Sequence, residues 1–529
     1  MLLISLTLLI VYVSLISKNI ASGDRISDFT QEADNKLFFL YKNMNRMGVI
    51  LVLYVLYLMV SIFSLENINS GISLYNNLFK MTSLSTTISM LITMLASIFL
   101  MLNSVNIMGY SPVDNVHFKH KEYVMLILFN LLGLMLFPMV NDIISLFVMM
   151  ELQSYSLYLM TTTHRESNNS TKSGLMYFLL GGLASMLMLL GSSMLYFITG
   201  MTSLDSMYTL VDYDNYISSI YFGFVFIVLG LIWKMGLAPF HNWSITVYNY
   251  TPTIVTSYIS LMAKFSMLPF VYTIIVNTYS MNSENNYLNL MIAISILLSM
   301  IIGSMGGLNQ MKMKVTLAYS GVINAGYLLL ALLVNSQEGM VGFIVYIYQY
   351  GLTHINLFFI LLSTSYYMMY NANINNNSNN KGNSSMLLST FSPMEYMNQL
   401  NGLLTKNSYL AMALMISLFS LMGMPPLMGF YGKFFMTISS TNKGYMTLSL
   451  ALMLFSVVTT VYYAYIIKTV SFTKISNFIT VVTSSEGNKL SNSVTYVIST
   501  ITLITLVNIC QIDTMLQGAY ILAFSNLVM

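Results

Sequence analysis

Charged side chains are scarce in this sequence, and their scarcity excludes a water-soluble fold. Only 7% of the 529 residues are Asp, Glu, Lys or Arg, 56% are hydrophobic, and the mean hydropathy is +0.71. Soluble domains carry about 25% charged residues. The apolar residues also gather in runs of about 20, which is long enough to cross a bilayer. We therefore predict an all-α polytopic membrane protein.

Cysteine is almost absent, since Cys510 is the only one. A single thiol excludes an internal disulfide, a Cys-ligated cluster and a c-type haem attachment motif. The sequence also lacks a Walker A loop, a G-x-G-x-x-G turn, an H-E-x-x-H helix and a serine nucleophile elbow. The net charge of +3 forms no block of like charges, so we expect membrane lipids and no nucleic acid as partners. We expect no cofactor, metal site or redox centre on this chain.

Polar breaks divide the apolar residues into about fourteen predicted transmembrane helices. Their ranges are 1–17, 47–64, 82–107, 122–138, 141–162, 173–199, 216–238, 253–278, 287–305, 315–334, 340–369, 407–437, 445–470 and 493–511. The first run has neither a basic segment before it nor a small-residue cleavage site after it, which predicts a retained helix. The Asn- and Ser-rich residues 371–385 predict a mobile loop, and residues 516–529 predict one further apolar or interfacial segment.

The charges in the loops provide an independent check on this helix count. Lys and Arg concentrate in the loops on the side of the membrane where the chain is made. Loops after odd-numbered helices hold nearly all of them, including Lys312 and Lys314, whereas loops after even-numbered helices hold only Lys80 and Lys443. A helix miscounted in the middle would destroy this alternation. We refer to the two sides as the basic face and the opposite face.

Four ionisable residues remain deep inside the predicted helices: Glu151, Lys234, Lys264 and Lys433. Each costs roughly 2.5 to 3.5 kcal/mol at a helix centre, and such residues usually face a bundle interior or a water-filled path. Burial disfavours the charged form of an amine and a nearby carboxylate favours it, so proton occupancy becomes switchable. The alternative is a set of fixed ion pairs that lock helices together. One acid cannot pair with three bases, although the position of Lys264 alone could be explained by the charge of Glu151 or of Lys234.

Two of these lysines stand near helix breakers. The stretch LIWKMGLAPFHNW places Lys234 before Pro239, and GMPPLMGFYGKFF places Lys433 after Pro425 and Pro426. Backbone broken inside a membrane is tolerated only where it is buried in protein or lines a cavity. A break with a charge beside it, once in each half of the chain, is typical of inverted-repeat transporters. We predict that the seventh and twelfth helices are broken.

One histidine lies in a predicted helix that is rich in polar groups. His354 belongs to the stretch YQYGLTHINLFF, which also carries Tyr350 and Asn356. These groups predict either a hydrated proton path toward the second half of the chain or a core histidine with its hydrogen bonds satisfied. The sequence favours neither interpretation.

Several stretches resemble chain 2 of respiratory complex I (NADH:ubiquinone oxidoreductase), the NuoN type of antiporter-like subunit. They lie between about Tyr123 and Lys468 and read ELQSYSLYLM (151–160), ESNNSTKSGLMYFLLGGLASMLMLLGSSMLYFITG (166–200), KMGLAPFHNW (234–243), LAYSGVINAGY (317–327) and GMPPLMGFYGKF (423–434). The resemblance implies about fourteen helices with two inverted five-helix repeats in a mitochondrially encoded subunit. The chain would divide into N-terminal helices (1–120), a first repeat (121–278), a second repeat (287–470) and a C-terminal helix with its tail (471–529).

The resemblance also implies roles for the buried charges. It pairs Glu151 in the fifth helix with Lys234 in the seventh, makes Lys264 in the eighth a linking lysine, and makes Lys433 in the twelfth an exit-side lysine. Two positions depart from the family pattern. Family members often have Pro-Asp-Val-Tyr at residues 245–248, where this chain reads Ile-Thr-Val-Tyr, and often a histidine where Asn324 stands. No loop carboxylate and no histidine are therefore expected to act at those positions.

The function implied by the resemblance is proton transport across the mitochondrial inner membrane, driven by quinone reduction elsewhere in the complex. FMN, iron–sulfur clusters and ubiquinone would lie on partner subunits, and the neighbours would be other membrane-arm subunits, including sister antiporter-like chains. Two alternatives remain open from the residues. One is a stand-alone cation/proton antiporter of the related family, which has the same arrangement of buried charges. The other is a structural membrane subunit whose lysines only hold helices together.

Overall fold

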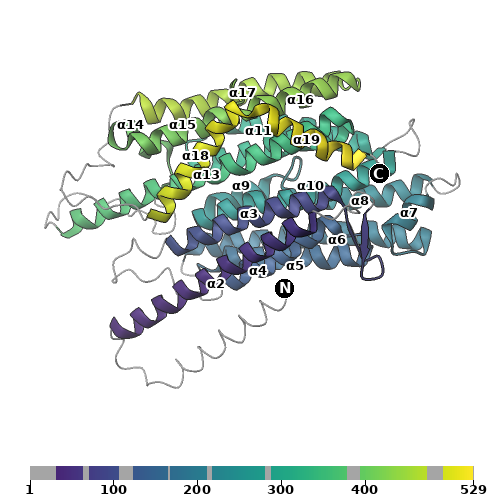
Figure 1. Ribbon diagram of the computed structural model, residues 1–529, viewed down its shortest axis with the longest axis horizontal. Helices are drawn as coiled ribbons and strands as arrows, with labels where there is room; N and C mark the ends of the chain where they lie inside the picture. Colours follow the sequence, from purple (N-terminus) through teal and green to yellow (C-terminus); the bar gives the residue numbers. More distant parts are fainter. Residues whose placement is uncertain are drawn as a thin grey trace.

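A computed structural model describes residues 31–63, 71–105, 123–164, 167–210, 217–279, 287–377, 394–473 and 492–527, and almost all of these residues are helical. Most run along the long axis of the molecule (Figure 1). Within these residues nine helices are long and apolar enough to cross a membrane, or ten if one bent pair counts as a single span, and three more apolar helices are shorter. The polytopic all-α class is confirmed, and the described spans number fewer than the predicted fourteen. The first predicted helix (1–17) lies outside the described residues.

The elements follow the predicted order along the chain. They are α2 (Gln31–Phe63), β1 (Ile72–Leu74), β2 (Phe79–Met81), α3 (Ser83–Val105), α4 (Tyr123–Leu136), η3 (Phe137–Met139), α5 (Ile143–Thr162), α6 (Asn168–Thr199), α7 (Leu204–Leu210), α8 (Ile217–Met235), α9 (Asn242–Tyr250), α10 (Thr253–Tyr279), α11 (Tyr287–Leu308), α12 (Met313–Val334), α13 (Gln337–Asn377), η4 (Met397–Leu400), α14 (Leu403–Lys406), α15 (Ser408–Met422), α16 (Met428–Asn442), α17 (Met446–Ser471), α18 (Asn492–Cys510) and α19 (Ile512–Leu527).

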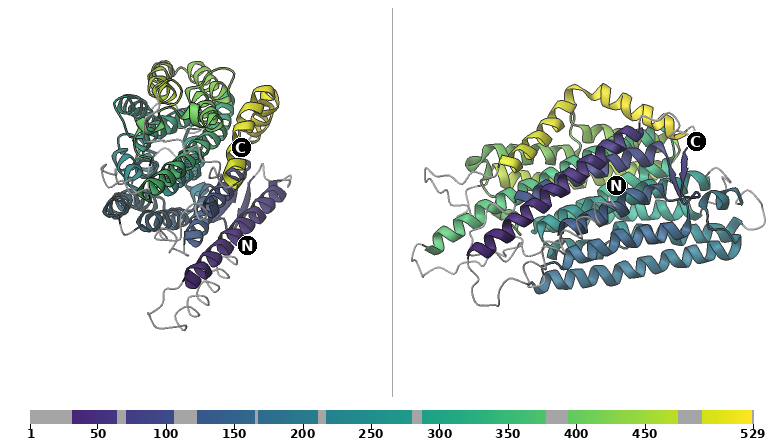
Figure 2. Two further views of the ribbon diagram at one scale, coloured as in Figure 1. Left: turned by 90° about the vertical axis from the view of Figure 1, so that its left-hand side faces the viewer. Right: turned by 60° about the horizontal axis from the view of Figure 1, so that its bottom comes forward.

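Three central helices, α10, α12 and α13, have nearly all of their membrane-spanning residues buried. By contrast, α2 and the pair α18–α19 lie on the outside of the bundle (Figure 2). The two helices of this pair meet at an angle of 89° after Cys510. The predicted segment 516–529 lies in the second of them and is helical as far as Leu527. A helix that is apolar all round is buried in protein or lipid. The central position of α10 and α13 therefore keeps Lys264 and His354 away from the lipid.

The two predicted helix breaks are present. The helix α8 ends before Gly236, which has a φ of +70°, and Pro239 lies in the turn that follows. The helix α15 ends before Gly423, with a φ of +82°, and Pro425 and Pro426 lie in its turn. Glycine suits both positions because other residues rarely adopt positive φ. The nine-residue helix α9 after the first break was not predicted, since it is too short to be recognised as a span.

The predicted separation of residues 122–138 from 141–162 is also present. Pro138 lies in the short helix η3, and α5 begins after Asp142, whose Oδ1 accepts a hydrogen bond from the Ile144 N–H at 2.8 Å. A side-chain oxygen at this position satisfies one of the free N–H groups at a helix start. The boundary between the fourth and fifth predicted helices is therefore confirmed, although in the sequence only Pro138 and Asn141 marked it.

One local prediction needs correction, and one local element was not predicted. The predicted loop 371–385 begins too early, because α13 continues to Asn377, and residues 378–385 lie outside the described part. Extending an existing helix costs far less than starting one, so α13 runs past the end of its apolar stretch. The antiparallel hairpin β1–β2 was not predicted at all, because strands of three residues are too short to show an alternating pattern.

Candidate functional site

The first buried charge pair joins α5 and α8. Lys234 Nζ lies 3.3 Å from Glu151 Oε1, and the two side chains are only 5% and 14% exposed. The second carboxylate oxygen, Oε2, accepts a hydrogen bond from the Ser154 hydroxyl at 3.2 Å. The predicted pairing of Glu151 with Lys234 is therefore present in the structure. In a charge pair this well buried, the distance between the two helices determines how strongly Lys234 retains its proton.

The break after α8 fixes the position of Lys234. The Leu237 N–H donates to the Ile232 carbonyl at 3.2 Å, and the Gly236 N–H donates to the Trp233 carbonyl at 3.0 Å. The same Trp233 carbonyl accepts a second bond from the indole N–H of Trp243 on α9, at 2.8 Å. Lys234 thus sits in the last turn of α8, where the helix dipole favours a cation. The break and α9 together hold it in place.

Lys264 on α10 has a neutral partner. Its Nζ donates to the Gly321 carbonyl of α12 at 2.8 Å, and the residue is 2% exposed. No Asp or Glu among the described residues forms an ion pair with Lys264, so it is not the partner of Glu151. A β carbon at Gly321 would stand 3.1 Å from this Nζ, which shows that the glycine leaves room for the ammonium group.

His354 lies on α13 within the electrostatic reach of Lys264. Its ring packs between Tyr350, at 5.4 Å, and Phe358, at 4.8 Å between ring centres. The imidazole Nδ1 and the Tyr350 hydroxyl are buried and have no hydrogen-bond partner among the described residues. The described protein atoms therefore leave this ring nitrogen without a partner, and both interpretations of His354 remain hypotheses.

Lys433 occupies the second break and has no carboxylate partner among the described residues. Its Nζ donates to the carbonyls of Leu421 and Met422, at 3.0 and 2.9 Å, which are the last carbonyls of α15. The Tyr327 ring of α12 lies below the same ammonium group, with 5.5 Å between Nζ and the ring centre. A helix C-terminus and an aromatic face both stabilise a cation. Lys433 is thus held by partial charges alone.

Polar side chains connect the surroundings of Lys264 with those of Lys433. The Tyr346 hydroxyl donates to Asn324 Oδ1 at 2.9 Å, and Gln349 Nε2 donates to the Ser420 hydroxyl at 2.9 Å. Three buried polar atoms in the same region lack a partner among the described residues: Tyr327 Oη, Gln349 Oε1 and Tyr350 Oη. Buried polar groups are normally satisfied by protein or by ordered water. These three atoms are therefore positions at which ordered water would complete the hydrogen bonding.

One buried lysine was missed from the sequence. Lys314 was placed in a loop because helix 315–334 was predicted to begin one residue after it, whereas α12 begins at Met313 and Lys314 is only 5% exposed. Its Nζ donates to the Thr251 carbonyl at 2.6 Å. Residues of helical periodicity before Val315 were the signal that could have placed it inside the helix. Tyr327, which contacts Lys433, was missed because an aromatic residue in an apolar helix usually means packing.

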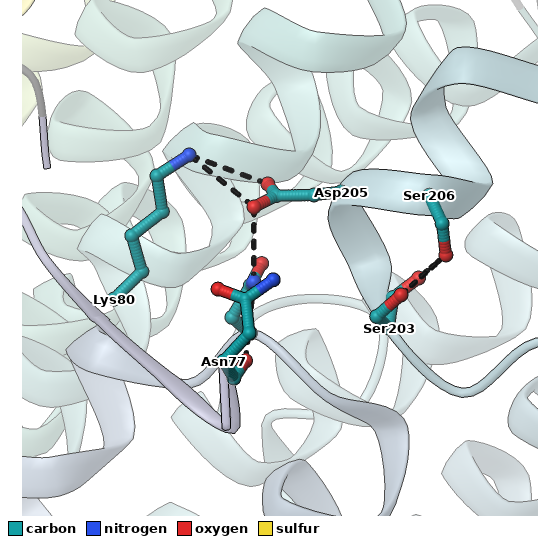
Figure 3. Close-up of polar contacts among 6 residues, drawn as sticks. Asn77, Lys80, Ser203, Asp205 and Ser206 are labelled. Carbon is teal, nitrogen blue, oxygen red and sulfur yellow. Dashed lines mark hydrogen bonds and ion pairs between the residues drawn. The ribbon is translucent and has the colours of Figure 1, made fainter. Parts of the chain in front are cut away.

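A different kind of ion pair lies on the opposite face of the molecule. Lys80 in β2 and Asp205 in α7 approach to 3.4 Å, and Asn141 Nδ2 donates to the same carboxylate at 3.0 Å (Figure 3). Both charged side chains are more than a third exposed, at 37% and 39%. Exposed pairs contribute little because water screens them. We interpret this pair as a connection between the hairpin and α7, separate from the buried lysines.

Similarity to known proteins covers most of the chain. The family described as NADH:quinone oxidoreductase/Mrp antiporter, TM, matches residues 140–461. NADH-ubiquinone oxidoreductase chain 2 of Rhizopus oryzae is 35% identical over 511 residues, which cover 91% of this chain and 94% of the relative. NADH-quinone oxidoreductase subunit N of Rhodospirillum rubrum is 32% identical over 352 residues, covering 66% and 67% of the two chains.

The fold has counterparts among solved structures. A chain of respiratory complex I from Thermus thermophilus with bound aureothin superposes with a TM-score of 0.69. The match covers 98% of this chain and 99% of that chain, at 20% sequence identity. At this identity the likeness shows the fold alone.

Proposed function

This chain belongs to the chain 2 family of NADH:quinone oxidoreductase, within the antiporter-like membrane subunits, and on that premise we propose that it translocates protons in the membrane arm of respiratory complex I. Its enzymatic role is that of a subunit of a proton-translocating NADH:ubiquinone reductase. The oxidation of NADH and the reduction of quinone take place on other subunits, which carry FMN, iron–sulfur clusters and ubiquinone.

The ion pair between Lys234 and Glu151 is the observation that carries this proposal. The negative carboxylate stabilises the protonated form of Lys234 across 3.3 Å. If α5 and α8 move apart, that attraction weakens and the proton leaves Lys234 more easily. The helix break after Lys234 gives α8 an end that can shift without unwinding the helix. Redox energy can therefore be converted into proton release by changing one distance.

The proton then passes through Lys264 toward Lys433. Both lysines bond to backbone carbonyls, so each can gain or lose a proton without stranding a carboxylate. The polar groups between them, among them Tyr346 and Asn324, provide hydrogen-bonding positions for a water chain. His354 lies beside Lys264 and is a second candidate for this middle segment.

The proposal extends to the surroundings of the chain. We place it in the mitochondrial inner membrane as a multi-pass subunit, because fungal mitochondrial chain 2 proteins are among its relatives. Its neighbours would be other membrane-arm subunits, including sister antiporter-like chains. Residues 121–278 and 287–470 would act as two inverted repeats, each with one broken helix and one lysine beside the break.

The substitution Lys234→Ala tests the proposal. We expect the complex to assemble, because Glu151 can take up a proton when its partner is lost. Proton pumping and coupled quinone reduction should fall at least about ten-fold, in the range that positioned acid–base groups contribute. NADH-driven proton uptake into membrane vesicles measures the first, and quinone reduction measures the second. Lys443→Ala, at an exposed position on the opposite face, is the control and should leave both unchanged.

Assembly is checked in the same membranes. A native gel stained for NADH dehydrogenase activity should show this chain in the active high-mass band. Migration of the chain on its own would favour a stand-alone antiporter, and normal pumping by an assembled Lys234→Ala complex would favour a structural role.

A further inference from the structure

Lys314 is a buried lysine to which the transport path described above gives no role. It lies in the first turn of α12, near the basic face, and its Nζ donates to the carbonyl of Thr251 at the end of α9. Glu395 interacts with it electrostatically, and the backbone around Glu395 is bonded to the start of α12 through the Met313 N–H at 2.9 Å. An amine near the basic face therefore has a carboxylate nearby.

The helix α12 connects Lys314 with Lys264. Gly321, whose carbonyl binds Lys264, lies seven residues after Lys314 and thus two turns further along the same helix face. The rise along α12 between the two positions is about 10 Å. Lys314 and Lys264 are therefore successive cations on one side of a helix that is buried along nearly its whole length.

One tyrosine hydroxyl, that of Tyr350 on α13, lies at the Lys264 end of this stretch of α12. A β carbon at Gly321 would stand 3.5 Å from the Tyr350 hydroxyl and 3.1 Å from Lys264 Nζ, so these two groups are close neighbours. Tyr350 Oη is buried and has no hydrogen-bond partner among the described residues. A hydroxyl both donates and accepts, which is what a proton relay requires.

We propose that Lys314 is the proton-entry residue of this chain on the basic face and that Tyr350 lies on the route from it to Lys264. A hydrated proton binds to the neutral Nζ of Lys314 and forms an ammonium group. Each later transfer breaks one N–H or O–H bond and forms another, so that no electrons are exchanged. Glu395 attracts the proton to the entrance. The inference rests on the proposed function and adds the place where the path begins.

A purely structural role for Lys314 makes a different prediction. Lys314 also stabilises the C-terminal end of α9, where a cation is favoured by the helix dipole. Arginine would keep this charge and its hydrogen-bond donors, but it does not release its proton in proteins. The variant Lys314→Arg therefore separates proton transfer from capping, whereas Lys314→Met removes both.

The experiment measures NADH-driven proton uptake and NADH:quinone turnover in membranes that contain the assembled complex. We expect Lys314→Arg and Lys314→Met to lower both at least about ten-fold. Lys443→Met, at the exposed control position on the opposite face, should leave both unchanged. Pumping restored to the wild-type rate by Lys314→Arg would overturn the proposal and leave Lys314 a capping residue.

A second variant keeps the inference testable if the Lys314 variants do not assemble. Tyr350→Phe removes only a hydroxyl that has no partner among the described residues, so folding should be unaffected. We expect a several-fold lower rate of proton uptake, and an unchanged rate would rule out the route from Lys314 through Tyr350. Lys234→Ala, measured in parallel, distinguishes a failure of the proposed function from a failure of the entry route. A normal rate in Lys234→Ala would refute the proposed function itself. A low rate in Lys234→Ala together with normal rates in Lys314→Arg and Tyr350→Phe would refute the entry route alone.

Discussion

The two helix breaks are built from the same parts but treat their lysines differently. Each has a glycine with positive φ, a proline turn and a buried lysine. At the first break Lys234 faces the carboxylate of Glu151 on another helix. At the second break Lys433 faces the terminal carbonyls of α15 and the ring of Tyr327. One lysine is thus paired with a full charge and the other with partial charges.

This difference separates two tasks in proton transport. The attraction between full charges changes strongly with distance, so helix movement can control when Lys234 holds its proton. The carbonyls of α15 and the ring of Tyr327 carry only partial charges, so the same movement would change their attraction for Lys433 less. Under the proposed function, the first break would be the controlled step and the second the exit position. Three substitutions test this comparison.

The largest effect is expected for Glu151→Gln. Glutamine keeps the size of the side chain and removes the charge that stabilises protonated Lys234. Breaking one side of a buried ion pair costs about 3 to 5 kcal/mol, and we expect proton pumping to fall at least about ten-fold. NADH-driven quenching of a pH-sensitive dye in membrane vesicles measures it.

Ser154→Ala is the matched control for this substitution. It removes only the hydroxyl that bonds to Glu151 Oε2 and leaves the carboxylate in place. A single hydrogen bond to a charged group contributes about 1.5 to 3 kcal/mol, so its effect on pumping should be smaller than that of Glu151→Gln. If Glu151→Gln pumps normally, the full charge at the first break is dispensable and the comparison fails.

Much of the first break could be predicted from sequence, because its signals are local. A charge in an apolar run is conspicuous, and Pro239 five residues after Lys234 marks the broken backbone. The pairing of Lys234 with Glu151 was implied only by the family resemblance, because the residues alone also allowed Lys264 to pair with Glu151. Pro138 and Asn141 likewise marked a helix boundary, whereas the capping role of Asp142 became evident only in the structure.

The surroundings of Lys433 and Lys264 could not be predicted in the same way. Their partners are backbone carbonyls and an aromatic ring, and every residue of a helix carries a carbonyl, so no residue type marks the acceptor. Lys314 shows a related limit: burial at the start of a helix depends on which helix packs against it, here α9. The hairpin β1–β2 and the helix α9 are too short for periodicity to reveal them.

A smaller effect is expected at the second break for Tyr327→Leu. Leucine removes the ring below Lys433 and leaves the two carbonyl bonds of α15 intact. A desolvated cation–π contact contributes about 2 kcal/mol, which corresponds to at most about thirty-fold, so pumping should fall less than in Glu151→Gln, where about 3 to 5 kcal/mol are lost. Tyr327→Phe keeps the ring and should pump at close to the normal rate. Equal losses in both variants would assign the effect to the hydroxyl, and Lys433 would then depend on a relay and not on a fixed environment.

The smallest effect is expected at the ion pair that lies outside both breaks. Lys80→Met removes the partner of Asp205, but the two side chains are 37% and 39% exposed, so water replaces the lost contact. Exposed pairs contribute about 0 to 1 kcal/mol, and the thermal stability of the assembled complex should change little. Proton pumping should be unchanged, because Asp205 remains bonded to Asn141 and lies on the opposite face from Lys314. A marked loss of pumping in Lys80→Met would place a proton-handling charge outside the buried set, and burial would then no longer distinguish the lysines that carry protons from those that hold the fold together.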